Sequence, residues 1–201
     1  MRFGLFIPLI LMGCSMIGGG RDEAVVSTRG SVCGDPSIKG MSIGEVPGPG
    51  ACGIPDAVSV TQIGGITLSQ PAQMRCDKAR AMKGWIDRHM VPTIGNTGGG
   101  VTGLKVAAHY ACRSRNNQPG ARLSEHAKGK AIDIAAFQLA DGSEISVLDD
   151  WGSGKRGRIL RKLHGSACGP YGTVLGPESD VHHRDHFHFD IADHGYGPYC
   201  R

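Results

Sequence analysis

Residues 124–133 read Ser-Glu-His-Ala-Lys-Gly-Lys-Ala-Ile-Asp, and this stretch decides how the chain is expected to fold. It places an imidazole, His126, and a carboxylate, Asp133, on either side of Gly129, a residue that permits a sharp backbone turn between them. The two side chains are half of a potential metal site. The other half is expected in Asp-His-Phe-His at residues 185–188, so the rest of the chain should bring these two segments together.

The second segment has the two-residue period of a β-strand. Side chains of a strand alternate between its faces, so His186, His188 and Asp190 are expected on one face. Phe187 and Phe189 are then expected on the other face, where they bury the back of the sheet. Both histidines can therefore face the site, while the buried aromatic rings on the opposite face fix the position of the strand.

Further elements follow from periodicity and turn residues. Alternating apolar residues predict strands and hairpins, and apolar residues at three- and four-residue steps predict helices. Pro92 is expected to stop the first helix after Met90. The predicted elements are a β-hairpin over 56–68, a helix from 71 to 90, a strand over 103–110, a strand pair over 131–137 and 144–147, a helix over 155–164, and strands over 172–175 and 187–191.

The N-terminus has the pattern of an export signal. Arg2 supplies a positive charge, a short apolar stretch covers residues 3–12, and Leu11-Met-Gly-Cys14 resembles a bacterial lipobox, in which Cys14 is acylated. About ten apolar residues are too few to span a bilayer. We therefore expect residues 1–13 to be a lipoprotein-type signal peptide, with a plain secretory signal or a start assigned too early as the alternatives.

Residues 14–50 are expected to form a flexible tether, and residues 51–201 the folded domain. The tether segment is rich in Gly, Ser and Pro, with Gly-Gly-Gly at 18–20 and Pro-Gly-Pro-Gly at 47–50, and lacks a sustained apolar period. This organisation suits a membrane-anchored lipoprotein of the periplasm; a soluble secreted protein is the alternative.

The cysteines also indicate export to an oxidising compartment. The chain has seven, and setting Cys14 aside for the lipid leaves an even number that can pair as disulfides. No Cys-x-x-Cys motif occurs, so a cysteine zinc site or a thioredoxin-type redox site is not expected. Cys33 and Cys52 would close a loop if they paired with each other. The disulfide candidates are Cys33, Cys52, Cys76, Cys112, Cys168 and Cys200.

Composition and charge narrow the classes of function. At 201 residues the chain can hold one catalytic-sized domain, and with 32 glycines but only 5% aromatic residues we expect many loops and a modest core. The formal net charge of +4 is mild, and no basic run interleaved with aromatic residues occurs. Nucleic acid is therefore not an expected partner, and we expect a monomer.

The motif residues meet the needs of a hydrolytic zinc site. A catalytic zinc takes three protein ligands and keeps a fourth position for water, and His126, Asp133 and His188 are the ligand candidates. Asp185, three residues before His188, is placed to act as the base that accepts a proton from this water. Arg113, at a predicted strand end, suits the cation that stabilises an oxyanion in the transition state.

Each signal also has an ordinary structural interpretation. A lone His-x-His is more often a strand with satisfied imidazoles, His109 suits a core position, and Arg115 suits a solvated loop. His182 and His183 raise the local density of imidazoles and are expected beside the site or at the surface. The motifs carry more weight together than singly.

Two resemblances follow from these residues. Ser124-x-His126-x-x-Gly129-x-Ala131-x-Asp133, followed by Asp185-x-x-His188, is similar to the zinc motif of the D-alanyl-D-alanine carboxypeptidase and dipeptidase group, which includes peptidoglycan L,D-endopeptidases. Over roughly residues 51 to 200 the chain more closely resembles the bacterial extensin-like C-terminal family. That resemblance rests on Tyr110-Ala-Cys-Arg113, Ser124-Glu-His-Ala, Trp151, Cys168, Val174-Leu-Gly-Pro177 and His183-Arg-Asp-His-Phe-His188.

The resemblance implies a fold and a set of roles. The fold is a small α+β domain with helices against a central antiparallel sheet, a zinc site at the sheet face and disulfide bracing. The three ligand candidates would hold Zn²⁺, Asp185 would be the general base, Arg113 the transition-state cation, and His186 a supporting residue. One position departs from the pattern, because the carboxypeptidases commonly have Glu where this chain has Asp185, whereas Asp occurs among related endopeptidases.

The function implied is that of an exported metallopeptidase, a zinc-dependent hydrolase acting on cell-wall peptidoglycan. Its partners would be peptidoglycan peptides, together with the membrane through the N-terminal lipid anchor. Cleavage of stem-peptide or crosslink amide bonds is expected, with D-Ala-type endopeptidase action favoured over carboxypeptidase action. The alternative is a zinc-stabilised, non-catalytic cell-wall-binding or scaffold domain.

Overall fold

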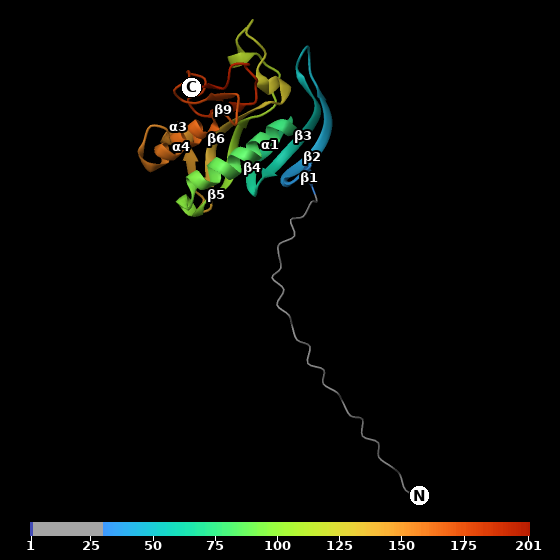
Figure 1. Ribbon diagram of the computed structural model, residues 1–201, viewed down its shortest axis with the longest axis vertical. Coiled ribbons are helices and arrows are strands. Elements are labelled where there is room, and N and C mark those ends of the chain that lie inside the picture. The colour runs from blue at the N-terminus through green and yellow to red at the C-terminus, as the bar shows by residue number, and fades with distance from the viewer. Residues whose placement is uncertain (2–29) are drawn as a thin grey trace.

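The computed structural model describes Met1 and residues 30–201, and its framework is one mixed β-sheet (Figure 1). Within these residues ten strands are joined in the order β1-β2-β3-β4-β5-β6-β9-β8-β10, and β7 pairs with β6. The strands are β1 Ser31–Val32, β2 Asp35–Pro47, β3 Gly53–Ile63, β4 Ile66–Arg75, β5 Val101–Ala108, β6 Ala131–Leu139, β7 Glu144–Ser146, β8 Thr173–Leu175, β9 Phe187–Asp190 and β10 Tyr199–Cys200.

Helices pack against this sheet, and α1 lies across β3 and β4 in Figure 1. None of the helices in the described part of the chain is both long and apolar enough to cross a membrane. The α-helices are α1 Cys76–Trp85, α2 Val91–Ile94, α3 Val147–Asp150 and α4 Gly154–Ala167, with a π-helical turn Ile86–Met90 between α1 and α2 and 3₁₀ turns η2 Thr97–Gly99, η3 Arg115–Asn117 and η4 Glu125–Lys128.

The α+β class is confirmed, but the expectation of a small, antiparallel sheet is wrong. β4 pairs with β5 in parallel, and so does β10 with β8, so the sheet is mixed. It is also larger than expected, because residues assigned to the tether belong to it. β1 and β2 add two antiparallel strands beside β3.

The tether predicted over 14–50 is therefore wrong from Ser31 onward, and the reason lies in its glycines. A Cβ on Gly40 would lie 2.1 Å from the backbone oxygen of Ser59, so glycine is required there for close approach of β2 to β3. Gly44 has φ +69° beside a register shift in the same ladder. These glycines shape a bulged strand and do not mark a linker. Residues 14–29, like the signal peptide 1–13, lie outside the described residues.

The predicted hairpin is confirmed, with its turn at Gly64 and Gly65, but the following helix begins later than expected. β4 continues its pairing with β3 as far as Arg75. The buried residue Met74 therefore belongs to a strand and not to the helix. Pro92 does not stop the helical run at Met90. It lies at the start of α2, in a helical run that continues from Met90, and the π-helical turn Ile86–Met90 immediately precedes α2.

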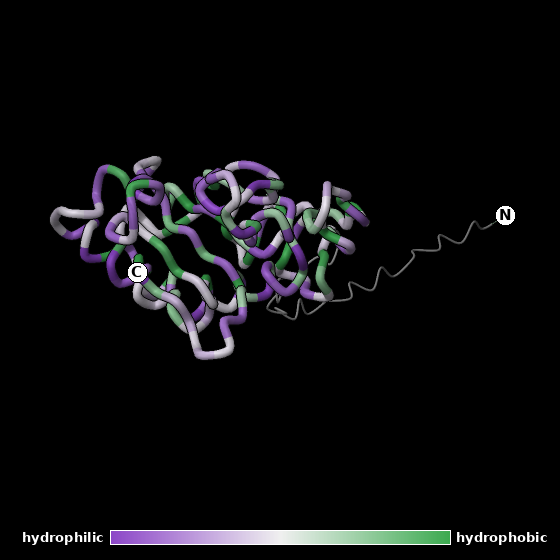
Figure 2. Tube along the Cα trace, turned by 90° about the horizontal axis from the view of Figure 1, so that it is seen from above, coloured by the Kyte–Doolittle hydropathy of each residue, from purple (hydrophilic) through white to green (hydrophobic). Residues whose placement is uncertain are grey.

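Aromatic residues form the centre of the core, which is larger than the composition indicated. Trp85 of α1 packs against Phe189 of β9 at 5.2 Å between ring centroids, and Phe189 stacks on Tyr171 at 4.9 Å. Phe187 and Phe137 lie in the same cluster, 6.2 Å apart, and all five rings are buried. Hydrophobic segments run along the strands in the middle of the molecule, whereas the peripheral loops are largely hydrophilic (Figure 2).

Three disulfides join all the cysteines of residues 30–201, in agreement with the prediction that these residues pair. The suggested disulfide between Cys33 and Cys52 is wrong, because Cys33 bonds to Cys76 at the start of α1. Cys52 bonds instead to Cys112, next to Arg113. The third disulfide joins Cys168 to Cys200 and fastens the end of the chain to the end of α4.

Candidate metal centre

The pairing of β6 with β9 places two of the predicted ligands opposite each other. Asp133 and His188 are directly paired residues in this antiparallel ladder. Their neighbours along the strands, Ile134 and Phe187, point into the core, so the period of two turns the carboxylate and the imidazole to the other face. Strand register therefore brings together two side chains that are 55 residues apart.

A short turn before β6 delivers the third ligand. The Ser124 hydroxyl caps turn η4 by accepting a hydrogen bond from the His126 N–H. Gly129 ends the turn with φ +64°, and a Cβ there would lie 2.4 Å from Ile54 Cδ1. The predicted need for glycine at this position is thus confirmed both by conformation and by space. The turn leaves His126 fully buried beside Asp133.

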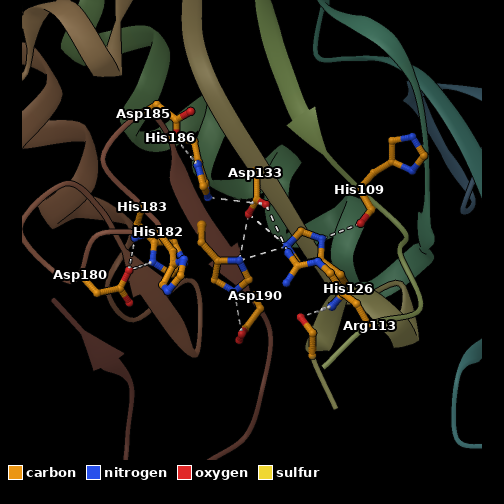
Figure 3. Close-up of polar contacts among 12 residues, drawn as sticks. His109, Arg113, His126, Asp133, Asp180, His182, His183, Asp185, His186 and Asp190 are labelled. Atoms are coloured by element: carbon orange, nitrogen blue, oxygen red, sulfur yellow. Dashed lines mark hydrogen bonds and ion pairs between the residues drawn. The ribbon is translucent and has the colours of Figure 1, made fainter. Parts of the chain in front are cut away.

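The ligand atoms of the three side chains converge on one point, and Figure 3 shows His126 and Asp133 directed at each other. His126 Nε2 lies 3.1 Å from Asp133 Oδ1 and 3.1 Å from His188 Nδ1. His188 Nδ1 lies 2.9 Å from the same Asp133 oxygen. Among the described residues, this is the cluster of His, Cys, Asp and Glu side chains whose ligand atoms are close enough to hold a metal ion.

The far nitrogen of each imidazole has its own oxygen partner. His126 Nδ1 lies 2.5 Å from the backbone oxygen of His109, and His188 Nε2 lies 3.1 Å from Asp190 Oδ2. A carbonyl or carboxylate oxygen can only accept, so each far nitrogen is the donor. Each near nitrogen then carries a lone pair, directed at the Asp133 carboxylate. Such oxygen partners are typical of metal-ligating histidines, whose tautomer they fix.

The electrostatics of the cluster require positive charge at its centre. Burial alone raises the pKa of the Asp133 carboxyl, but hydrogen bonds and charges from His126 and His188 outweigh it and hold that pKa well below its usual range. Burial lowers the pKa of His188, yet its bonds to Asp133 and Asp190 raise it to about 9. A second proton on His188 is therefore the alternative to a metal cation, and the two compete for the same nitrogen.

The donor set fits zinc. Two nitrogens and one carboxylate oxygen are a common protein contribution to a catalytic zinc, and ligands at zinc distances in a tetrahedron are about 3.3 Å apart. The separations of 2.9–3.1 Å here are close to that value. His126, Asp133 and His188 are the residues that would hold the ion.

Asp185 and His186 lie at the edge of the cluster. His186 Nδ1 lies 2.8 Å from Asp185 Oδ1, and His186 Nε2 lies 3.7 Å from Asp133 Oδ2. The Asp185 side chain is 65% exposed and lies beyond His186 as seen from Asp133 (Figure 3). The structure thus connects Asp185 to the centre through His186, whereas sequence spacing alone indicated a direct role.

Arg113 approaches the cluster from the opposite side. Its Nη2 lies 3.9 Å from Asp133 Oδ2, and its side chain is 27% exposed. The disulfide from the neighbouring Cys112 to Cys52 fastens this loop to the segment between β2 and β3. The guanidinium is therefore placed beside the candidate metal ligands and still reaches solvent.

The cluster lies at the floor of a groove of about 350 Å³, to which His188 and Asp190 contribute. His183, expected beside the site or at the surface, is buried in the wall of this groove and bonds to Asp180 Oδ1 at 2.7 Å. The exposed His182 lies next to it in sequence and offers only its backbone N–H to Asp180.

Sequence reasoning missed two contributors to the centre. Asp190 was placed on the same strand face as His188 but given no role, and its spacing of two residues from a ligand was the available signal. His109 was considered only for its imidazole, which accepts from the Gln73 N–H at 3.4 Å. Its contribution is the backbone oxygen that orients His126, for which a sequence gives no signal.

Comparisons with known proteins identify one family. The model of the family described as "Extensin-like protein C-terminus" matches residues 39–201. Neither the search of curated proteins nor the search of solved structures gave a match. The matched residues include β3 to β10, both segments of the metal cluster and the groove above it.

Proposed function

The chain belongs to the extensin-like protein C-terminus family, and we propose that it is an exported, zinc-dependent peptidase of peptidoglycan. The reaction is hydrolysis of amide bonds in stem peptides or crosslinks. Endopeptidase action on D-Ala-type crosslinks is favoured over carboxypeptidase action, because the acid before the second histidine motif is Asp185 and not Glu. The proposed function thus rests on the residues of the candidate metal site and not on the family name.

One observation carries the proposal. Asp133 Oδ1, His126 Nε2 and His188 Nδ1 lie within 3.1 Å of one another in a buried position, and the donor hydrogens of both imidazoles are directed to other oxygens. Three lone pairs facing one another at buried positions are unfavourable unless a cation lies between them. Zinc satisfies all three at once, whereas a single proton satisfies two.

Zinc in this position supplies a Lewis acid that polarises a carbonyl group and makes water a stronger acid. The chain supplies the remaining functions. Arg113, beside Asp133, is placed to donate hydrogen bonds to the oxygen of an amide carbonyl as it gains negative charge. The groove above His188 is open on one side, so a peptide can lie across it.

Asp185 and His186 are the residues that handle the proton. Because Asp185 accepts a hydrogen bond from His186 Nδ1, the His186 Nε2 lone pair is free and faces the cluster. In this arrangement His186 Nε2 accepts a proton from the attacking water, and Asp185 orients and stabilises the imidazolium that forms. Asp185 then acts through His186, a refinement of the direct role expected from spacing.

The proposed location is the periplasm, with the protein anchored to the membrane through Cys14. Three disulfides among residues 30–201 support export, because disulfides persist in oxidising compartments. The signal-like residues 1–13 and Cys14 support the lipid anchor from sequence alone. Mass spectrometry of the membrane fraction, before and after Cys14→Ser, tests the acylation.

The catalytic proposal is tested by digestion of defined crosslinked and uncrosslinked muropeptides, with products identified by mass spectrometry. We expect His126→Ala to reduce kcat/KM by at least about 10³-fold and Asp185→Ala by about 10²-fold to 10⁴-fold. His182→Ala, which removes an exposed imidazole near the site, is the matched control and should keep full activity. Full activity in both His126→Ala and Asp185→Ala would sink the mechanism.

A zinc-stabilised wall-binding domain is the second candidate, and the 65% exposure of the Asp185 carboxylate favours it. A carboxylate that faces solvent stabilises the His186 imidazolium less than one held inside the groove. This candidate predicts that the zinc-loaded protein binds isolated cell walls, that binding survives Asp185→Ala, and that no new peptide is released. Release of any zinc-dependent peptide product excludes it.

A further inference from the structure

A small hairpin above the metal cluster places three arginines in one wall of the groove. Ser114 and Leu123 form an isolated antiparallel bridge, and the Arg115 N–H donates to the Arg122 backbone oxygen at 2.9 Å. Arg115 and Arg122 are therefore cross-strand neighbours. Arg113 precedes Arg115 by two residues, just before the 3₁₀ turn η3 that Arg115 begins. All three side chains line the groove.

Arg115 and Arg122 carry charges that the protein itself does not neutralise. Both are exposed, and within residues 30–201 neither guanidinium has an ion-pair or hydrogen-bond partner. The three acids that line the groove are already engaged: Glu125 pairs with Lys128 at 3.2 Å, Asp180 with His183, and Asp190 with His188. Like charges directly opposite each other in a ladder are destabilising, and an anion bound between them removes that repulsion.

We propose that Arg115 and Arg122 form a binding site for a carboxylate of the peptide substrate, a step beyond the proposed function that rests on it. Guanidinium groups bind carboxylates through paired, charge-assisted hydrogen bonds, and two of them side by side select a planar anion over a neutral amide. The aromatic residues Tyr196 and Tyr199 also line the groove and offer apolar contact to the rest of the peptide.

The position of the pair indicates where this carboxylate lies in the substrate. Arg113 is 3.9 Å from the metal ligand Asp133, so it marks the reacting end of the groove. Arg115 and Arg122 line the same groove, and among the described residues neither guanidinium is bonded to a candidate ligand. The carboxylate recognised by Arg115 and Arg122 is therefore expected outside the bond that is cleaved.

The test measures binding separately from hydrolysis. A stem-type tetrapeptide with one side-chain and one C-terminal carboxylate is compared with two forms, each amidated at one of these groups. Affinities are measured by titration calorimetry with the zinc-loaded Asp185→Ala protein, and mass spectrometry verifies that the peptide stays intact. We expect one of the amidated forms to bind about 10 to 100-fold more weakly, which identifies the carboxylate that is recognised.

The variant Arg115→Gln/Arg122→Gln should weaken binding of the unmodified peptide to the same extent and abolish the difference between the three forms. Arg158→Gln, an exposed arginine on α4 outside the groove, is the matched control and should keep the wild-type preference. Equal binding of all three peptides, a preference that survives in the double variant, or no saturable binding of the unmodified peptide would each overturn the inference.

The muropeptide digestion separates this inference from the proposed function. Carboxylate preference without any product from crosslinked or uncrosslinked muropeptides with the wild-type protein supports the binding site and contradicts catalysis. Product formation without carboxylate preference supports catalysis and contradicts the role of Arg115 and Arg122.

Discussion

The two faces of strand β9 are both buried, but their side chains make different kinds of contact. On one face, Phe187 and Phe189 are fully buried among aromatic rings. On the other, His188 and Asp190 are 7% and 3% exposed, and each polar atom directed inward has a hydrogen-bond partner. Burial therefore does not separate packing from chemistry here. The kind of partner does: ring contacts on one face, and carboxylates and imidazoles on the other.

The comparison predicts that changes to the aromatic face act on stability. Phe189→Ala removes a ring that contacts Trp85 and Tyr171, and we expect the free energy of unfolding to fall by about 3–5 kcal/mol. Chemical denaturation measures this loss. Phe189→Leu, which keeps most of the apolar volume, should cost less than half as much. A loss below about 1 kcal/mol for the alanine variant would break the comparison.

The polar face is predicted to act on metal affinity instead. Asp190→Asn keeps the size of the side chain but removes the charge that orients and polarises His188, so we expect zinc affinity to fall by about 10 to 100-fold. Competition with a chromophoric chelator measures it. Asp56→Asn, an exposed aspartate distant from the groove, serves as control. Unchanged zinc affinity in Asp190→Asn would mean that Asp190 does not support a metal ligand.

Lys78 is a polar side chain buried against the aromatic core, and so an exception to the apolar contacts there. It is fully buried, its Nζ has no hydrogen-bond partner among the described residues, and it lies 4.0 Å from the centre of the Tyr171 ring. Burial lowers the pKa of Lys78 to about 7, although the charges of Asp190 and Asp133 act to raise it. The same burial raises the pKa of the Tyr171 hydroxyl, which is also unpartnered.

The lowered pKa of Lys78 predicts how the free energy of unfolding depends on pH. Its pKa is about 7 in the folded chain and 10.5 when solvated, so between these values the unfolded state binds more protons and stability rises with pH. Below pH 7 both states are protonated and this contribution stays at its minimum. We expect Lys78→Met to reduce that rise and to stabilise the protein by about 1 kcal/mol at pH 7.

Thermal unfolding from pH 6 to 10 measures the effect. The profile of Lys78→Met should be flatter than that of the wild type, and Lys155→Met, a change to an exposed lysine, should leave the profile unchanged. An identical rise in Lys78→Met and wild type would show that Lys78 keeps its ordinary pKa in the folded chain.

The sequence was sufficient to predict the local parts of the site. Gly129 allowed the turn that places His126, and the alternation around His188 put ligand and aromatic residues on opposite faces. Both features depend on a few neighbouring residues, so their period and conformation are readable in one chain. The α+β class, which the resemblance implied, is confirmed, and so is the expectation that the six later cysteines form disulfides, but their partners could not be read from the sequence.

Features that depend on contacts between distant segments were not readable. From the sequence alone, the glycines of β2 indicate a linker. In the structure, β3 approaches β2 so closely that a side chain would not fit at Gly40. Cys33 has several possible partners by sequence, and only the fold brings it to Cys76. The pairing of Arg115 with Arg122 likewise depends on a hairpin whose turn contains two asparagines with positive φ, Asn116 and Asn117, a conformation with weak local signals.

The most direct test of the account is the zinc content and zinc affinity of the purified protein. Elemental analysis and titration should give one zinc per chain in the wild type and in His182→Ala, and a loss of affinity of at least about 10³-fold in His126→Ala. Circular dichroism of His126→Ala verifies that the fold is kept. A wild-type protein that takes up no zinc, or a folded His126→Ala protein that binds zinc as tightly as the wild type, would contradict the assignment of His126, Asp133 and His188 as a metal centre.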